Sequence, residues 1–326
     1  MLVESTNTTA SRQLPSGSDL VRAGRITEAL QALDASDPRP EALPTVRHLA
    51  ALTECHLARG DLTRAMAAGE RVRAFAPTAG VPGALAAYTM GEIASAQGEA
   101  ELAFVRYTEA NERLGDEDRD DPNEVPWRAG AALALTRLHR QREADRLARE
   151  HLGLARQSGT PYTLAHALRT AATTNADGAR LRLLREAQVV LKNVEACRLS
   201  AQVDTDLAVL LTLQGDPAGA TEAVMLLRRA EAYAGREDLF PLQTRIRGIL
   251  ERVGEVPRRI LSETLATLTV TEQTTARLAA SGLTNREIAA ELAVTVKAVE
   301  WHLSNVYRKL KIRGRPGLSE TLGQPV

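Results

Sequence analysis

Apolar and polar residues alternate with a helical period along most of the chain. Between Asp19 and about Gly254, apolar residues recur every three or four positions, and short polar turns separate one such segment from the next. On an α-helix this spacing gathers the apolar side chains on one face. The pattern therefore predicts a succession of amphipathic helices that are paired through short turns.

A loose repeat is superimposed on this pattern. Each copy has a first helix, a turn and a second helix, and the turn glycines Gly60 and Gly98 lie 38 residues apart. That spacing is close to the period of tetratricopeptide-like repeats, in which small residues let paired helices approach closely. The third copy has Arg140 and Gln141 where the others have glycine. We expect about five or six helical hairpins over residues 18–253. The clearest copies are residues 56–72, 93–110, 137–155 and 210–230.

Two segments interrupt the helical pattern. Residues 1–17 are rich in Ser, Thr and Asn without periodicity, so we expect a disordered N-terminus. Residues 254–267 contain Gly254 and Pro257 followed by a polar stretch, as is typical of an interdomain linker. Residues 268–326 are then predicted to form a separate C-terminal domain.

Helix ends can be predicted in this last segment from local chemistry. Thr269 with Glu272, and Thr284 with Glu287, are T-x-x-E capping boxes, in which the hydroxyl and the carboxylate each satisfy a backbone N–H. Gly282 stands where a left-handed residue ends the first helix. The second helix is predicted from Asn285 to about Leu292, with Leu283 and Ile288 as a hydrophobic staple.

The third helix follows a turn of about three residues and has Thr295 as its expected N-cap, with Val294 packed on Val299. A short helix, a tight turn and a longer helix make a helix-turn-helix. The helical period predicts a buried stripe of Val299, Leu303, Val306 and Leu310, and His302 is expected to be half-buried beside it. The opposite face holds Lys297, Trp301, Ser304 and Arg308, with Asn305 beside them and Glu300 and Lys311 toward one edge.

Composition and charge agree with this division. The chain has 3% aromatic residues, and recurrent Ala, Leu and Arg favour an all-α protein packed through small and medium side chains. The formal net charge is +0, yet from Leu268 to Arg315 eight basic residues face four acidic ones. A tryptophan exposed between cations is best explained by a surface that a partner covers. Double-stranded DNA is the partner that a basic helix-turn-helix predicts.

The residues of this segment resemble a known family. GLTNREIAAEL followed by VKAVEWHLSNVYRKLKIRGR is similar to the DNA-binding domain of LuxR-type transcription regulators. With the Ala-rich array and the VPRR linker before it, the run VEWHLSNVYRKL is most similar to the C-terminal half of the large ATP-binding LuxR-type regulators. The resemblance implies that Lys297, Glu300, Trp301 and Ser304 touch DNA and that Arg308 lies near its backbone.

The sequence departs from the family at two places. Many members have a cation where Glu300 stands, so this acid would accept from cytosine N4 or pair with a neighbour. The fourth helix, which often makes the dimer contact, is replaced by GRPGLSETLGQPV, and we expect it to be short or frayed. Homodimerisation on DNA is therefore an open question.

Other chemistry finds little support in the sequence. No G-x-x-x-x-G-K-[ST] motif occurs, so no nucleotide cofactor is expected, and no catalytic constellation is recognisable. The acidic segment 115–124 fails as an EF-hand, because Asp121 and Trp127 stand where Gly and Glu are required, so we expect a solvated loop and no metal. Cys55 and Cys197 are expected to be reduced packing residues. With neither a signal peptide nor a membrane span in the pattern, a cytoplasmic protein is predicted, associated with the nucleoid when bound to DNA.

The leading hypothesis is a sequence-specific DNA-binding transcription regulator whose array binds a protein or small-molecule effector. The alternative is a helical-repeat interaction scaffold whose DNA-binding module is vestigial. The sequence offers little support for an enzyme. A sigma factor is disfavoured because the chain has no aromatic-rich promoter-melting segment upstream of the motif.

Overall fold

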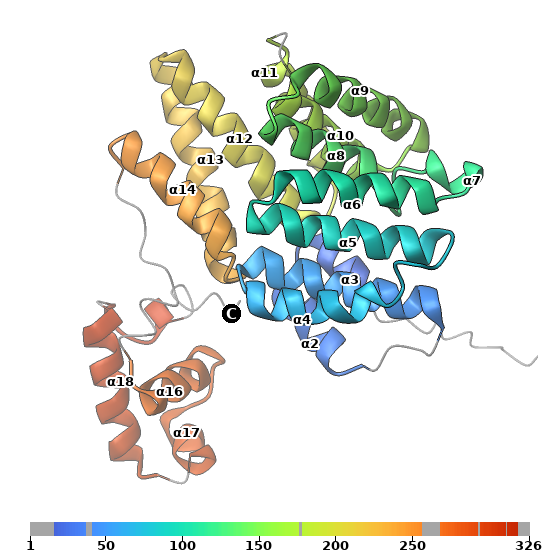
Figure 1. Cartoon of the computed structure of the whole chain (residues 1–326). Helices are drawn as coiled ribbons and strands as arrows, with labels where there is room; N and C mark the ends of the chain where they lie inside the picture. Colours follow the sequence, from blue (N-terminus) through green and yellow to red (C-terminus); the bar gives the residue numbers. More distant parts are fainter. Residues whose placement is uncertain are drawn as a thin grey trace, which may run out of the picture. The chain divides into compact units, whose positions relative to one another are not determined.

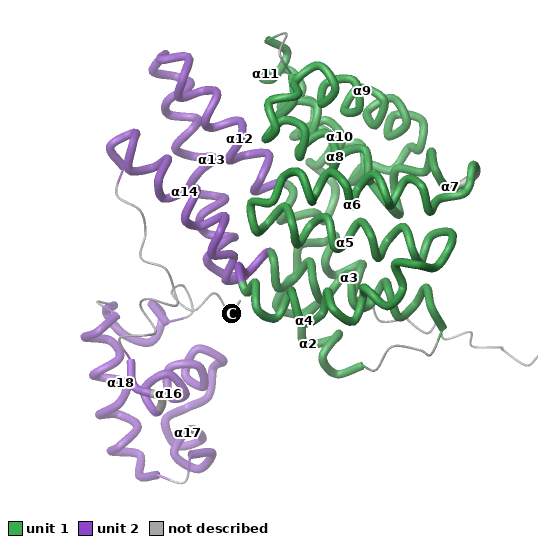
Figure 2. Tube along the Cα trace, viewed as in Figure 1, with its two compact units in different colours: residues 1–57, 61–199 green, residues 58–60, 200–326 purple. Residues whose placement is uncertain are grey.

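The computed structural model describes residues 16–36, 41–175, 178–255, 268–292, 294–310 and 312–318. Within these residues the regular structure is entirely helical, which confirms the predicted all-α class. The chain divides into two compact units, residues 1–57 with 61–199 and residues 58–60 with 200–326 (Figure 2). The predicted N-terminal segment up to residue 15, and the predicted linker from residue 256, lie outside the described residues, so the predicted domain ranges stay a prediction.

The helices follow one another through short turns (Figure 1). Their bounds are α1 Gly17–Ala23, α2 Ile26–Asp34, α3 Ala42–Arg59, α4 Leu62–Arg73, α5 Val81–Gln97, α6 Ala100–Arg113, α7 Asp116–Arg119, α8 Trp127–Arg137, α9 Gln141–Ser158, α10 Pro161–Thr174, α11 Arg180–Leu191, α12 Cys197–Gln214, α13 Pro217–Arg236 and α14 Phe240–Arg252. The C-terminal helices are α16 Val270–Ala280, α17 Asn285–Glu291 and α18 Val296–Leu310.

Consecutive helices pack as antiparallel pairs, and neighbouring pairs cover one another. Helix α5 packs on α6, α8 on α9 and α10 on α11, while α6 also packs on α8 and α9 on α10. Each pair thus buries the face that the previous pair leaves open, which is how a helical-repeat array builds a continuous core. The predicted tetratricopeptide-like array is confirmed.

The turns inside the pairs share one backbone motif. Gly60 and Gly98 adopt positive φ values of 77° and 85°, and the next residue donates its N–H to the carbonyl five residues earlier, as Asp61 does to His56 at 2.9 Å. This is a Schellman turn, which satisfies carbonyls at the end of the first helix. The predicted glycines therefore do occupy left-handed positions.

The third repeat shows where the sequence interpretation was wrong. Its left-handed residue is His139, with φ of 59°, and Arg140 N–H donates to the carbonyl of Leu135 at 2.9 Å. Arg140 and Gln141, which were compared with the glycines, lie one and two residues too late. The motif is conserved in shape while its glycine has been replaced by a residue that pays a steric cost there.

Small residues create room for large ones within the array. The ring of Tyr107 lies so close to Gly91 and Gly130 that a Cβ at either position would come within 2.6 and 2.5 Å of it. The Tyr107 hydroxyl donates to Glu92 Oε1 at 2.5 Å. Burial raises the pKa of Glu92, although hydrogen bonds from Tyr107 and Tyr88 act in the opposite direction. Gly91 and Gly130 thus allow an aromatic ring to enter between helices.

The connection between α7 and α8 touches helices from distant repeats. Asn123 accepts hydrogen bonds from Arg22 of α1 on its carbonyl at 2.8 Å and from Thr163 of α10 on Oδ1 at 2.7 Å. Glu124 pairs with Arg47 of α3 at 2.6 Å. In an extended array a loop meets only neighbouring repeats. Contacts with α1, α3 and α10 show that this connection ties the first unit together across several repeats.

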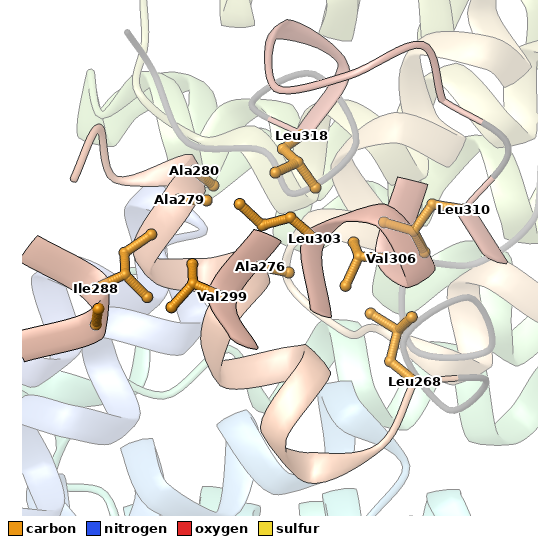
Figure 3. Packing of buried hydrophobic residues seen from close by; sticks show 11 residues of the cluster. Leu268, Ala276, Ala279, Ala280, Ile288, Val299, Leu303, Val306, Leu310 and Leu318 are labelled. Carbon is orange, nitrogen blue, oxygen red and sulfur yellow. The ribbon is translucent and has the colours of Figure 1, made fainter. Parts of the chain in front are cut away.

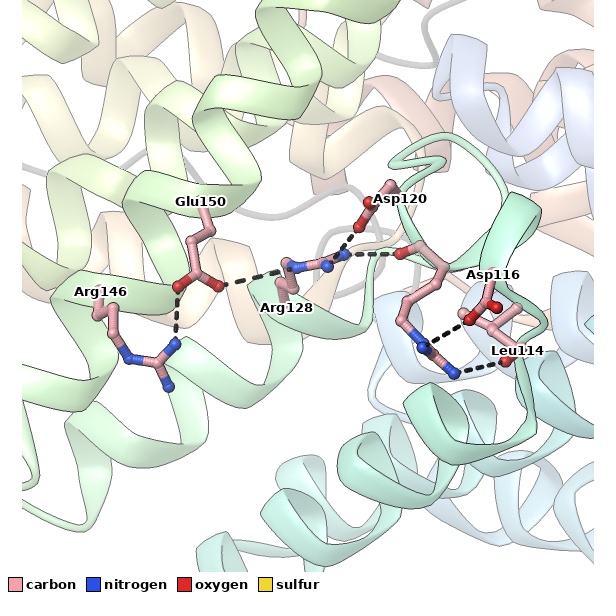
Figure 4. Close-up of polar contacts among 7 residues, drawn as sticks. Leu114, Asp116, Asp120, Arg128, Arg146 and Glu150 are labelled. Carbon is pink, nitrogen blue, oxygen red and sulfur yellow. Dashed lines mark hydrogen bonds and ion pairs between the residues drawn. The ribbon is translucent and has the colours of Figure 1, made fainter.

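The acidic residues just before this connection are also paired. Arg128 of α8 bonds Asp120 at 2.6 Å and the carbonyl of Arg119 at 2.7 Å, and it lies 4.0 Å from Glu150 (Figure 4). Arg119 in turn bonds Asp116 and the carbonyl of Leu114. The predicted solvated loop is confirmed, since the side chains of Asp116 and Asp120 are 96% and 64% exposed, and their arginine partners are close in sequence.

The two cysteines differ. Neither forms a disulfide; Cys55 is buried, as predicted, whereas Cys197 is exposed at the first residue of α12, so its predicted packing role is wrong. Helical periodicity carried little information there because the residue lies at a helix end. Among the described residues, no helix is long and apolar enough to span a membrane.

Candidate DNA-binding surface

Helices α16, α17 and α18 enclose a small core of their own. The predicted stripe on α18 is confirmed, since Val299 and Val306 are fully buried and Leu303 and Leu310 nearly so. Leu318, beyond α18, is also fully buried in this core (Figure 3). The members of the cluster are Leu268, Ala276, Ala279, Ala280, Ile288, Ala289, Val299, Leu303, Val306, Leu310 and Leu318. We call residues 268–318 the C-terminal module.

Threonine side chains cap all three helices of this module, as predicted. Thr269 accepts from the backbone of Glu272 at 3.3 Å while Glu272 Oε2 accepts from Thr269 N–H at 2.7 Å, and Thr284 and Glu287 repeat both distances. Thr295 Oγ1 accepts from the N–H of Ala298 at 3.2 Å. These bonds satisfy backbone donors that the first turn of a helix leaves unpaired. They fix where α16, α17 and α18 begin.

Two basic residues hold the module together. Lys309 of α18 pairs with the buried Glu272 of α16 at 2.5 Å. Burial of Glu272 would raise its pKa, but the bonds from Lys309 and Thr269 outweigh that effect and lower it. Arg315 donates to the carbonyl of Leu283 at 2.5 Å and to Asn285 Oδ1 at 2.9 Å. Lys309 and Arg315 belong to the basic segment, and the sequence alone does not distinguish them from the cations on the exposed face of α18.

The predicted site residues that the structure describes lie together on one face of α18. Lys297, Glu300, Trp301, Ser304 and Arg308 are exposed and Asn305 is half-buried, whereas Lys311 lies outside the described residues. The Trp301 side chain is 63% exposed, and its ring meets that of the half-buried His302 edge-on at 5.0 Å. This face is opposite the buried stripe. Its placement is therefore as expected, while the role of each residue stays a prediction.

Local hydrogen bonds order part of this face. Ser304 Oγ donates to the carbonyl of Glu300 at 2.8 Å, and Arg308 donates to Asn305 Oδ1 at 3.1 Å. Ser304 keeps acceptor capacity on its hydroxyl, and the guanidinium of Arg308 keeps further donors. The face thus combines two cations, a carboxylate, a hydroxyl and an aromatic ring.

Apolar exposure at the start of α18 was not foreseen. Val294 and Val296 expose 38% and 40% of their surface. Val294 had been expected to pack on Val299, but it is exposed and is not among the apolar residues that pack against the module core. Among the described residues, no group of three or more His, Cys, Asp or Glu side chains is placed to hold a metal ion.

The geometry of the module agrees with comparisons to known proteins. Residues 266–320 match the model of the family described as GerE, bacterial regulatory proteins of the luxR family. The C-terminal module is a helix-turn-helix domain of the LuxR family. The regulator AlkS of Alcanivorax borkumensis is 36% identical over 55 residues, which are 17% of this chain and 6% of AlkS.

Longer relatives match most of the chain. A protein of Mycobacterium bovis and one of Mycobacterium tuberculosis, both named as HTH-type transcriptional regulators, are each 29% identical over 297 residues, or 90% of this chain. The chain spans about 28% of the length of these relatives. The array with the module thus corresponds to a portion of larger regulators.

The fold of the array also has a counterpart among solved structures. A Rap protein in complex with Competence and Sporulation Factor is similar with a TM-score of 0.52 and 13% sequence identity. The match covers 92% of this chain and 81% of the Rap chain. At this level of identity the similarity concerns the helical-repeat fold.

Proposed function

We propose that this protein is a sequence-specific DNA-binding transcription regulator in which α18 enters the major groove. The observation that carries the proposal is the division of α18 into a buried stripe and an exposed face holding Lys297, Glu300, Trp301, Ser304 and Arg308. In helix-turn-helix proteins the second helix of the motif reads base edges, and flanking cations hold phosphates. The family of the module supports this use of the face.

The side chains suit different parts of the DNA. Lys297 and Arg308 carry the positive charge that phosphates require, and Lys311 is assigned to the same group from the sequence. Glu300 can accept from cytosine N4, and the hydroxyl of Ser304, whose hydrogen is donated to the carbonyl of Glu300, can accept from a base. Trp301 would be covered by DNA, with Asn305 holding Arg308 in place through the bond described above.

In this proposal the array is the region that receives a signal, as a protein or small-molecule effector. Its support is the repeat fold, which many proteins use as a binding surface, and the similarity to a Rap protein that was solved in complex with a factor. The regulator would act in the cytoplasm, at the nucleoid when bound. Two-fold related half-sites in its bound DNA would support a homodimer.

The proposal is tested by titrating the full chain against genomic fragments in mobility-shift assays at several salt concentrations. We expect sequence preference and affinity that falls as salt rises, because phosphate contacts release counterions. Binding that shows neither property would contradict the proposal and would favour the scaffold alternative. In that case, deletion of the residues after Gly254 should leave regulation intact.

Single substitutions test the roles of the residues. Lys297→Ala should weaken binding on all sequences and reduce the salt slope by about 1. Lys192→Ala removes the one lysine outside the basic segment and is the matched control, with no expected effect. Substitution of Glu300 or Ser304 should instead change the preferred bases by about 1 to 3 kcal/mol. Equal losses on every sequence from all variants would show that the base-reading assignment is wrong.

A further inference from the structure

The start of α18 carries exposed apolar surface that the proposed function has not used. In the described part of the module, the large apolar side chains that are clearly exposed are Val294, Val296 and Trp301, at 38%, 40% and 63%. They lie within eight positions of one another, in the turn before α18 and in the first two turns of that helix. Such surface is costly in water unless a partner covers it.

Val296 lies in line with two polar residues of the exposed face. At roughly 100° per residue, residues four apart on a helix are offset by about 40°, so Val296, Glu300 and Ser304 form one row. Lys297 and Trp301 form a second row beside it. Val296 is the first residue of α18, whereas Val294 belongs to the turn before it. N-terminal residues of a recognition helix are those that contact base edges.

The chemistry of this row matches the major-groove edges of pyrimidines. Apolar side chains contact the 5-methyl group of thymine, and a glutamate accepts from the N4 amino group of cytosine. Along the helix, Val296 and Glu300 are separated by a rise of about 6 Å. Successive bases on one strand are about 3.4 Å apart along the DNA axis, and helix residues about one turn apart can contact neighbouring bases, so that rise corresponds to one or two base steps.

We propose that Val296 reads the methyl group of a thymine while Glu300 reads a cytosine one or two base steps away. This inference rests on the proposed function and adds the identity and spacing of two bases to it. The exposed methyl groups of Val296 lose water when they meet the thymine methyl, which rewards T·A over the other pairs at that position. Glu300 favours cytosine at the second position. A guanine there would place its acceptor atoms O6 and N7 against the carboxylate.

The experiment starts from sequences that the full chain selects from a random duplex library. Each thymine of the selected site is replaced in turn by deoxyuridine, which removes the methyl group and keeps the base pairing. We expect one position at which this change weakens binding roughly fourfold, the factor that corresponds to one methyl-sized group returned to water. Val296→Ala should lose a similar factor on the thymine site and be insensitive to deoxyuridine there.

Two further variants complete the test. Val189→Ala is the matched control, because Val189 is an exposed valine of α11 at 74% and should leave the deoxyuridine effect unchanged. Glu300→Ala should relax the preference for a cytosine one or two steps from the sensitive thymine. Circular dichroism spectra that match the wild type show that each variant keeps its fold.

The outcomes separate the two proposals. If the full chain selects no sequence and binds without salt dependence, the proposed function itself fails. If it selects a site but deoxyuridine has no effect at any thymine, or Val296→Ala remains as sensitive as the wild type, the assignment of Val296 is overturned while the DNA-binding function stands. A sensitive thymine with Glu300 acting at an unrelated distance would overturn the spacing.

Discussion

The array and the C-terminal module secure their helices differently. In the array, helices α5, α6, α8, α9, α10, α11 and α14 begin without a side-chain cap hydrogen bond, whereas Ser16, Asp61 and Asp216 cap α1, α4 and α13. In the module, threonine side chains cap α16, α17 and α18. The array depends on packing between repeats, whereas the module depends on local bonds at each helix start.

Size explains this difference. Array helices are covered by neighbours on more than one side, and tertiary packing can then replace the contribution of a cap. The module has a core of eleven buried residues, so its burial stabilises it only modestly. Each cap and the Lys309–Glu272 pair therefore matter more in the module. A substitution in one region should therefore have little effect on the stability of the other.

The chain offers one tryptophan in each region as a reporter. Trp127 is the first residue of α8 and Trp301 lies on the open face of α18. A Trp127→Phe variant leaves only the module reporter, and a Trp301→Phe variant leaves only the array reporter. Unfolding of the two regions can thus be followed separately.

The largest expected effect is that of Leu303→Ala. Leu303 is 4% exposed in the centre of the module core, and its truncation should lower module stability by about 2 to 5 kcal/mol. Urea unfolding followed at Trp301 should shift strongly, while unfolding followed at Trp127 should not. Equal shifts at both reporters would show that the two regions unfold as one cooperative unit.

The second-largest expected effect is that of acid, which should destabilise the array more than the module. His151 is buried in the array, and burial, followed by the charges of His166 and Arg128, lowers its pKa to about 3. The unfolded chain therefore binds the proton first, so His151 alone lowers array stability as pH drops below about 6.5, by about 2 kcal/mol at pH 5, and His166, whose pKa burial lowers to about 4, adds to this loss. In the module, the pKa of Glu272 is lowered instead, so its contribution is lost only as pH falls below the ordinary value of 4.5.

The measurement is urea unfolding at pH 7.5 and pH 5 with each reporter. His151→Gln should reduce the loss seen at Trp127, and it also separates this effect from that of Glu92, whose raised pKa acts in the opposite direction. Module stability that falls as much as array stability between these two values would contradict the comparison.

The smallest expected effect is that of His139→Gly. Glycine adopts the positive φ of this turn without steric cost, so the substitution should stabilise the array by about 0.5 to 1 kcal/mol. Gly153→Ala, at a helical position with open space around it, is a control in which glycine removal should stabilise by a similar amount. A destabilising His139→Gly would mean that the His139 side chain contributes more than its backbone costs.

Features set by neighbouring residues could be predicted from the sequence. The capping boxes at Thr269 and Thr284, the left-handed Gly282 and the buried stripe of α18 depend on residues within a turn or two of each other, and all are confirmed. The exposed face of α18 follows from the same period. Its placement is thus as expected.

Features that depend on residues distant in the sequence could not be predicted from it. Lys309 and Glu272 are 37 residues apart and Arg315 and Leu283 are 32 apart, so the basic segment gave no sign of which cations are used internally. The contacts of Asn123 with α1 and α10 depend on how the repeats of the first unit pack together. His139 was missed because the search for the turn relied on glycine, although the backbone motif tolerates another residue there.

The central claim is that the exposed face of α18, rather than the array, contacts DNA. It is tested most directly by titrating selected duplex DNA into the two single-tryptophan variants and recording fluorescence. We predict a saturable change in Trp301 emission that high salt reverses, and no change in Trp127 emission. A change at Trp127 alone, or full DNA binding in a gel with Trp301 emission unaltered, would contradict the claim.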